Sequence, residues 1–90
     1  EAFKFLIVKL VKTDLKDEQL NILLNYIVNS NVKTLVLNHN HLTDVCLDAF
    51  LNFVNINKTL KNVHLANNPI NTLKNKTKIN TLKEKGIIIW

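Results

Sequence analysis

The sequence contains no methionine and no arginine, and it has only one cysteine, one glycine, one proline, one tryptophan and one tyrosine. A single cysteine cannot build a disulfide framework and is typical of a reducing compartment. No apolar run approaches the roughly 20 residues of a membrane span, and no signal peptide is visible. These absences predict a soluble domain of the cytoplasm.

The basic character of the chain rests on lysine alone. The net charge is +5, and without arginine the chain lacks the bidentate fork that dominates recognition of bases and phosphates. Lysine, asparagine and isoleucine have A/T-rich codons, so genome bias explains this balance at least as well as a polyanionic partner does. Ninety residues suffice for one domain and are too few for two. Because the chain opens at Glu1 and has no methionine, we expect 1–90 to be a fragment or a trimmed chain.

The sequence repeats itself. LTDVCLDAFLNFV (Leu42 to Val54) can be laid over LKDEQLNILLNYI (Leu15 to Ile27) at a constant offset of 27 residues. At an offset of 28, Val32, Leu35, Leu37, Asn40 and Leu42 fall on Leu60, Val63, Leu65, Asn68 and Ile70. The chain therefore contains three copies of a unit of about 28 residues. We place them at about 5–31, 32–59 and 60–86, with a terminal strand at 87–90.

Each copy has two halves with different hydrophobic periods. The first half alternates as a strand does, for example at Leu35 and Leu37. The second half spaces its apolar residues by three and four, which is typical of one stripe on a helix. Asp17 precedes the first stripe and Thr43 or Asp44 precedes the second, and we expect these residues to cap the helices. One unit cannot bury its apolar face alone, so the units must stack into a parallel sheet with helices behind it.

The third helical half departs from this pattern. NTLKNKTKINTLKEKG is polar, and only Leu73, Ile79 and Leu82 remain of its apolar stripe. We expect a shorter helix that ends near Gly86 as a C-cap. The closing GIIIW predicts a fourth strand, which closes the sheet edge or continues into further residues.

The segment LVLNHNHLTDVCLDAFLNFVNINKTL resembles a leucine-rich repeat of the ribonuclease-inhibitor type. The family pattern L-x-x-L-x-L-x-x-N-x-L is met from Val32 to Leu42 and again from Leu60 to Ile70, and NKTL at 57–60 matches the usual return into the next strand. The resemblance spans almost the whole chain, although the first copy has Thr13 where the asparagine belongs. It implies an α/β fold, a short right-handed leucine-rich-repeat solenoid with its parallel sheet on the concave side and its helices on the convex side.

Asn40 and Asn68 recur where each strand ends. The chain must turn sharply there, which leaves backbone N–H and C=O groups without sheet partners. A buried side-chain amide supplies both donors and an acceptor for them. We therefore assign both asparagines a structural role, in a stacked ladder.

The stretch NHNHLTDVC places two histidines near an acid and a cysteine. A zinc site needs three or four ligands in a fixed geometry, and beyond His39 and His41 the candidates are His64, one strand away, and Cys46. Cys46 falls at a packed turn, where a small buried thiol is the ordinary interpretation, and a reactive thiol would need an adjacent base. We expect no metal, no cofactor and no catalytic residue, so the chain is not predicted to be an enzyme.

Two further pairs repeat at equivalent positions. Asp17 and Asp44 recur in successive copies, which favours a structural role over an acid and base pair. Tyr26 and Phe53 also correspond, and we expect both to pack in the core or on the convex surface.

The strand residues between the framework leucines are expected to face solvent on the concave side. They are Ile7, Lys9, Val11, Lys12, Thr34, Val36, Asn38, His39, Asn62, His64, Ala66 and Asn67. Apolar residues rimmed by polar groups are typical of a protein-binding face, whereas singly exposed Ile and Val are normal on any surface. Taken as a set, these positions predict a non-catalytic module that binds another protein through this face and the adjacent loops.

The resemblance implies two kinds of role, blocking a partner enzyme or activating one as GTPase-activating relatives do. Blocking or scaffolding is favoured, and the composition would suit a bacterial effector delivered into a host cell as well as a protist protein. A nucleic-acid module is the rival, based on the lysine string Lys74, Lys76, Lys78, Lys83 and Lys85. We also expect one end of the sheet to be covered by further residues, a partner or a second copy.

Overall fold

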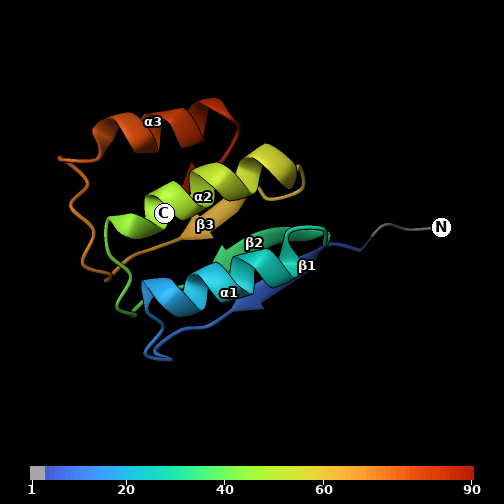
Figure 1. Cartoon of the computed structure of the whole chain (residues 1–90), viewed down its shortest axis with the longest axis horizontal. Helices are drawn as coiled ribbons and strands as arrows, with labels where there is room; N and C mark the ends of the chain where they lie inside the picture. Colours follow the sequence, from blue (N-terminus) through green and yellow to red (C-terminus); the bar gives the residue numbers. More distant parts are fainter. Residues whose placement is uncertain (1–3) are drawn as a thin grey trace.

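Four strands alternate with three helices in the computed structural model, which describes residues 4–90 (Figure 1). The strands are β1 (Leu6–Lys9), β2 (Val32–Val36), β3 (Asn62–His64) and β4 (Ile88–Ile89). The helices are α1 (Asp17–Ile27), α2 (Val45–Ile56) and α3 (Lys76–Glu84). Each helix thus connects two successive strands.

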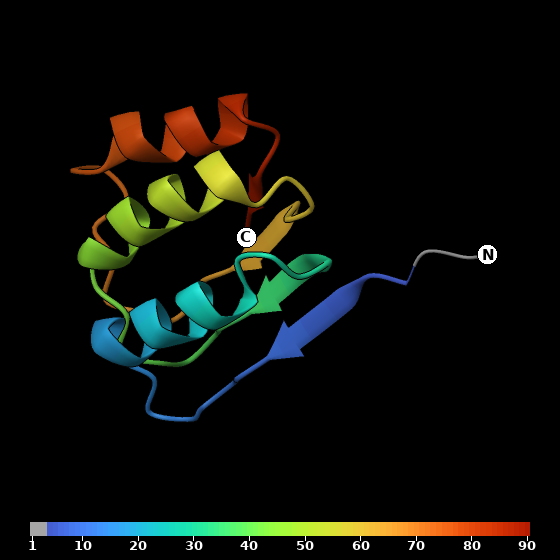
Figure 2. The same cartoon turned by 45° about the vertical axis from the view of Figure 1, so that its right-hand side comes forward.

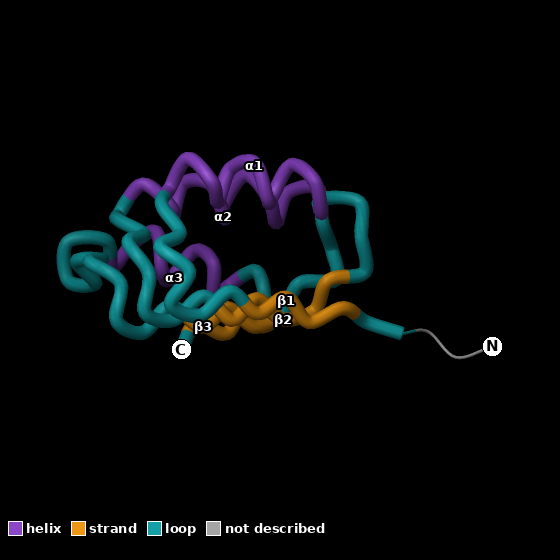
Figure 3. The backbone as a smooth tube through the Cα atoms, turned by 90° about the horizontal axis from the view of Figure 1, so that it is seen from below, coloured by secondary structure: helices purple, strands orange, loops and turns teal. Residues whose placement is uncertain are grey.

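The strands form one parallel sheet in the order β1-β2-β3-β4. Parallel neighbours need a long crossover connection, and each helix supplies one. The helices lie side by side with α2 in the middle (Figure 2), and all three cover the same face of the sheet (Figure 3). The predicted α/β class, the parallel sheet and the strand at GIIIW are confirmed.

The core lies between the sheet and the helix layer. Strand residues such as Leu35 and Val63 and helix residues such as Leu20, Phe50 and Leu82 are buried there. Burying one such side chain contributes about 1.5–3 kcal/mol, so these contacts supply the main driving force for the two layers to pack. Because strand residues alternate, the residues between the buried ones face away from the helices.

Helix α3 is shorter than the other two and buries Leu82 alone. It ends as expected near Gly86, whose φ of 88° is in the left-handed region that favours glycine. The N–H of Ile87 returns to the carbonyl of Leu82 at 3.1 Å, which closes the helix end. Leu73 precedes the helix and is 86% exposed, so its predicted place in the apolar stripe is wrong. The chain is still turning there, so Leu73 does not reach the helix face.

The turns after the first three strands share a residue in the left-handed conformation. Lys12, His39 and Asn67 occupy equivalent positions and have φ angles of 55°, 60° and 62°. A residue other than glycine costs about 1–2 kcal/mol in this region. The recurrence at equivalent positions shows that the turn geometry is imposed by the fold. Histidine and asparagine are enriched in this conformation, whereas the lysine at position 12 gives no such sign.

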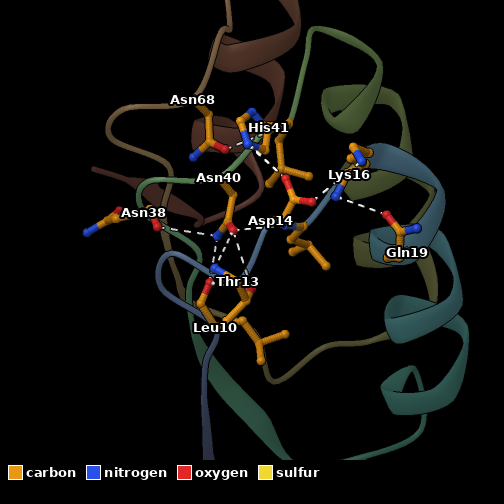
Figure 4. A network of polar contacts seen from close by, with 11 residues as sticks. Leu10, Thr13, Asp14, Lys16, Gln19, Asn38, Asn40, His41 and Asn68 are labelled. Atoms are coloured by element: carbon orange, nitrogen blue, oxygen red, sulfur yellow. Dashed lines mark hydrogen bonds and ion pairs between the residues drawn. The ribbon is translucent and has the colours of Figure 1, made fainter.

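The Asn40 side chain holds two successive turns together (Figure 4). Its Oδ1 accepts hydrogen bonds from the backbone N–H groups of Thr13 and Leu15, both at 3.0 Å. Its Nδ2 donates to the carbonyl oxygens of Leu10 at 2.6 Å and Leu37 at 3.0 Å. One buried amide therefore satisfies the backbone of the turn after β1 and of its own turn.

Asn68 repeats this arrangement one strand further on. Its Oδ1 accepts from the N–H of Leu42 at 3.0 Å, and its Nδ2 donates to the carbonyls of Leu37 at 2.9 Å and Leu65 at 3.1 Å. Asn40 and Asn68 thus stand in successive turns, each bonded to the backbone of the preceding one.

Another amide, Asn57, is buried and does the same at the opposite end of the strands. Its Nδ2 donates to the carbonyls of Val28 at 3.0 Å and Ser30 at 3.1 Å, and its Oδ1 accepts from the N–H of Leu60 at 2.9 Å. No bonding role was predicted for this residue. Its position could have indicated this role, because Asn57 begins the return segment between α2 and β3. The backbone N–H and C=O groups there again lie outside regular structure and need hydrogen-bond partners.

Neither aspartate bonds to the N–H groups of its own helix, so the side-chain capping expected of them is wrong, although Asp44 occupies the N-cap position of α2. The other candidate there, Thr43, does bond to the helix, because its Oγ1 accepts from the N–H of Val45 at 3.4 Å. Asp17 accepts from the backbone N–H of Thr43 at 3.1 Å and from its hydroxyl. Asp44 accepts from the N–H of Asn71 at 2.8 Å. This bond, with help from the Asn75 side chain, lowers the pKa of the Asp44 carboxyl. Each carboxylate therefore fastens the loop after the next strand.

We expect Asn40→Ala to lower the free energy of unfolding by about 3 kcal/mol, because it leaves buried backbone groups without partners. Urea denaturation followed by circular dichroism measures the change. Asn52→Ala is the matched control, because Asn52 is exposed on α2 and its loss should cost less than about 0.5 kcal/mol. Equal stability of the two variants would show that the amide does not hold the turns.

Candidate functional site

The face of the sheet opposite the helices gathers side chains from all four strands. The register aligns Ile7 with Thr34, Thr34 with Asn62, and Asn62 with Ile88. A second row aligns Lys9 with Val36 and Val36 with His64, and Trp90 lies beside His64. We call this surface the outer sheet face and define it by Ile7, Lys9, Thr34, Val36, Asn62, His64, Ile88 and Trp90. The row neighbours expected within the first three strands are confirmed.

Ile88 and Trp90 were missed as members of this face. The Trp90 ring stacks on the His64 ring with centroids 5.6 Å apart and planes inclined by 20°. Trp90 is nevertheless 61% exposed, so most of its indole surface is open to solvent. The signal was available, because extending the strand register into GIIIW brings Ile88 and Trp90 onto the same two rows.

The inner strands shield part of this face. Ile7 and Lys9 on the edge strand are exposed, whereas Thr34, Val36 and Asn62 are half-buried. A residue on a middle strand has neighbours on both sides, which covers its flanks. Of the predicted positions, the edge strand is therefore the most open to a partner.

The remaining predicted residues lie in the turns next to this face. Val11, Lys12, His39, Ala66 and Asn67 are exposed, and Asn38 is half-buried. The Oδ1 atom of Asn38 accepts from the N–H of Ala66 at 3.1 Å, and His39 Nε2 lies 3.3 Å from Asn67 Nδ2. The turns thus extend the face with polar groups that already contact one another.

Charge on this surface has one sign. Within residues 4–90 the carboxylates lie in turns and helices, and none lies on the outer sheet face. Lys9 lies on the face and Lys12 in the adjoining turn, so the apolar side chains are accompanied by positive charge. The outer sheet face therefore mixes apolar and polar side chains and is weakly basic.

The histidines of the turns do not assemble a metal site. His41 Nε2 lies 2.9 Å from Asp14 Oδ1, and both side chains are well exposed. Across the described part of the chain, no group of three or more His, Cys, Asp or Glu side chains could hold a metal ion. His41 instead pairs with an acid of the preceding turn.

Cys46 is buried at the start of α2. Burial raises the pKa of its thiol to about 12, and the nearby Asp17, Asp44 and Asp48 act in the same direction. A nucleophile needs the thiolate form, which this environment disfavours. The residue therefore packs like a small apolar side chain.

No protein-family model matches the chain, and no curated protein or solved structure matches it either. Within residues 4–90, no helix combines the length and the apolar character that crossing a membrane requires.

We expect Cys46 to resist alkylation by iodoacetamide at pH 8 in the native protein. With a pKa of about 12, only on the order of one thiol in ten thousand is ionised at that pH, and the side chain is buried. Mass spectrometry of the labelled protein over time measures the rate, and guanidinium chloride should restore rapid labelling. A native rate close to that of the unfolded protein would show an accessible thiol.

Proposed function

We propose that the chain is a short leucine-rich-repeat solenoid of the ribonuclease-inhibitor type that binds another protein without catalysis. The repeated pattern of Leu and Asn supports this assignment, as do the parallel sheet and the alternating helices. Asn40 and Asn68 support it further, because each bonds to the turn that precedes it. In a solenoid of this kind the sheet lines the concave side and is left open for a partner.

The observation that carries the proposal is the composition of the outer sheet face. Ile7, Val36, Ile88 and Trp90 are its apolar members, and Thr34, Asn62 and His64 lie between them in the two rows, with Lys9 at the edge. Protein interfaces mix apolar and polar side chains in this way, and tryptophan is enriched among the residues that dominate binding energy. The sheet also holds these side chains in fixed rows, which reduces the entropy lost on binding.

The partner contact fits blocking or scaffolding. A rigid, open face can cover a partner's surface without supplying a reacting group. The resemblance includes relatives that inhibit enzymes and relatives that activate GTPases. Activation of a GTPase would need particular loop residues, and we find none that match in this sequence. We therefore favour inhibition or positioning of a partner enzyme.

Nucleic acid is less suited to this face. Trp90 is its only aromatic side chain apart from the imidazole of His64, whereas single strands are bound by successive stacking platforms. The exposed lysines Lys74, Lys76, Lys83 and Lys85 lie on and beside α3, in the other layer of the fold. A solvated helix surface explains them adequately.

The proposal is tested by comparing Ile7→Asp with Ile56→Asp. These isoleucines are 61% and 64% exposed, but Ile7 lies on the outer sheet face and Ile56 at the end of α2. In affinity purification with mass spectrometry, Ile7→Asp should reduce partner capture by about tenfold or more, because burying the new charge is costly. Ile56→Asp should retain capture, and circular dichroism should be unchanged for both.

Equal capture by the two variants would refute the assignment of this face. Retention on heparin to high salt, with DNA binding that falls steeply as salt rises, would favour the nucleic-acid function instead.

A further inference from the structure

The two ends of the helix layer carry complementary surfaces. Phe53 of α2 is only 4% exposed, and together with Ala49 it packs along α1. The positions 27 residues earlier are Ile22 and Tyr26, which are 70% and 89% exposed. Helix α1 therefore shows to solvent the side that α2 uses to contact its neighbour. For Tyr26, the packing role predicted from sequence is wrong within this single chain.

This side of α1 continues into a larger apolar surface. Leu10, Leu15 and Leu23 form one wide and open apolar surface with Ile22 and Tyr26. Beside it runs the outer edge of β1. The N–H groups of Leu6 and Leu10 donate to β2 and its flanking residue, so those of Ile7 and Lys9 point away from the sheet. The first end thus offers a protruding apolar helix face and a strand edge.

The opposite end is hollow. A cavity of about 510 Å³ opens between α3, the turn after β3 and β4. Its apolar lining includes Leu65, Ile70, Leu73, Ile79 and Ile89. The N–H groups of Ile88 and Trp90 donate to β3 and its flanking residue, so the backbone groups of Ile89 point to the outer edge of β4.

Neighbouring helices of the chain are already joined by one pair of opposite charges, because Lys78 Nζ of α3 lies 3.0 Å from Asp48 Oδ1 of α2. The exposed Glu18 in the first turn of α1 and the lysines Lys76 and Lys83 beside the hollow can form a second pair of this kind if the two ends are brought together. Asp17 takes no part in it, because its carboxylate is bonded to Thr43.

We propose that successive copies of this chain bind head to tail, with α1 and β1 of one copy seated against the hollow beside α3 and β4 of the next. Strand β1 then adds in parallel to β4, in the same sense as the strands within one copy. Tyr26 and Ile22 enter the hollow in the same way that Phe53 and Ala49 of α2 pack on α1 within one copy. Such an interface joins different surfaces, so it builds an open row or a closed ring of copies and extends the outer sheet face across them.

The test uses two variants that each block one end. Tyr26→Asp alters the protruding end and Leu73→Asp alters the hollow, and both residues are so exposed that the fold should survive. In sedimentation velocity, the mass of the unaltered chain should rise beyond a dimer from micromolar to millimolar concentration. Each variant alone should be monomeric, with association weakened about tenfold or more. Mixing the two should give a one-to-one heterodimer, because one intact end of each kind remains.

Val45→Asp is the matched control, since Val45 is an exposed apolar residue of α2 that lines neither end. It should associate as the unaltered chain does. An unaltered chain that stays monomeric at every concentration would overturn the proposal. So would dimers of Leu73→Asp alone, which would show two copies meeting symmetrically through α1. Tyr26 and Leu73, the two residues altered here, lie outside the outer sheet face, so partner capture through that face is measured separately.

Discussion

The fold depends on satisfying backbone groups where parallel strands leave the sheet. A parallel strand cannot turn directly into its neighbour, so its last N–H and C=O groups lose their partners at each exit. Asn40 meets this need by bonding both the turn it lies in and the one before it. Asn68 does the same, which sets the spacing between turns. Once the turns are spaced in this way, the strands between them are held in register.

The register in turn decides which side chains are free to recognise another molecule. Leu35 and Val63 are committed to the core, so their neighbours along each strand must face outward. The outer sheet face is thus a by-product of the repeated core. Its composition is nevertheless specific to this chain, because only the outward positions can vary without disturbing the packing. The stacking of Trp90 on His64 shows two such positions packing on each other across β3 and β4.

Much of this could be predicted from the sequence, because spacing alone reports which residues are inside. The offsets of 27 and 28 residues predicted the parallel sheet and the neighbours within its first three strands. Apolar spacings of three and four predicted the helices, and the segment GIIIW predicted the C-terminal strand.

The hydrogen-bond partners of the two aspartates could not be predicted from residue spacing. Asp17 and Asp44 occupy positions that suit a helix cap, but the stacked geometry brings Thr43 and Asn71 within reach instead. A contact between successive copies of a pattern is invisible when each copy is considered alone. The left-handed conformation of Lys12 was hidden as well, because lysine gives no local sign of it, whereas histidine and asparagine at the equivalent positions are enriched in that region.

The repeated contacts also give the molecule a direction. Asp17 fastens the loop after β2, and Asp44 fastens the loop after β3, so each carboxylate bonds to the next unit along the chain. Each asparagine bonds to the preceding unit. A stack built from such one-way bonds has two unlike ends. Here the difference is sharpened because α1 keeps an apolar outer side, whereas α3 is mostly polar and stands over a hollow. Ile22 and Tyr26 leave an apolar side of α1 exposed to solvent within one copy. In the head-to-tail arrangement that we propose, these two side chains gain a neighbour.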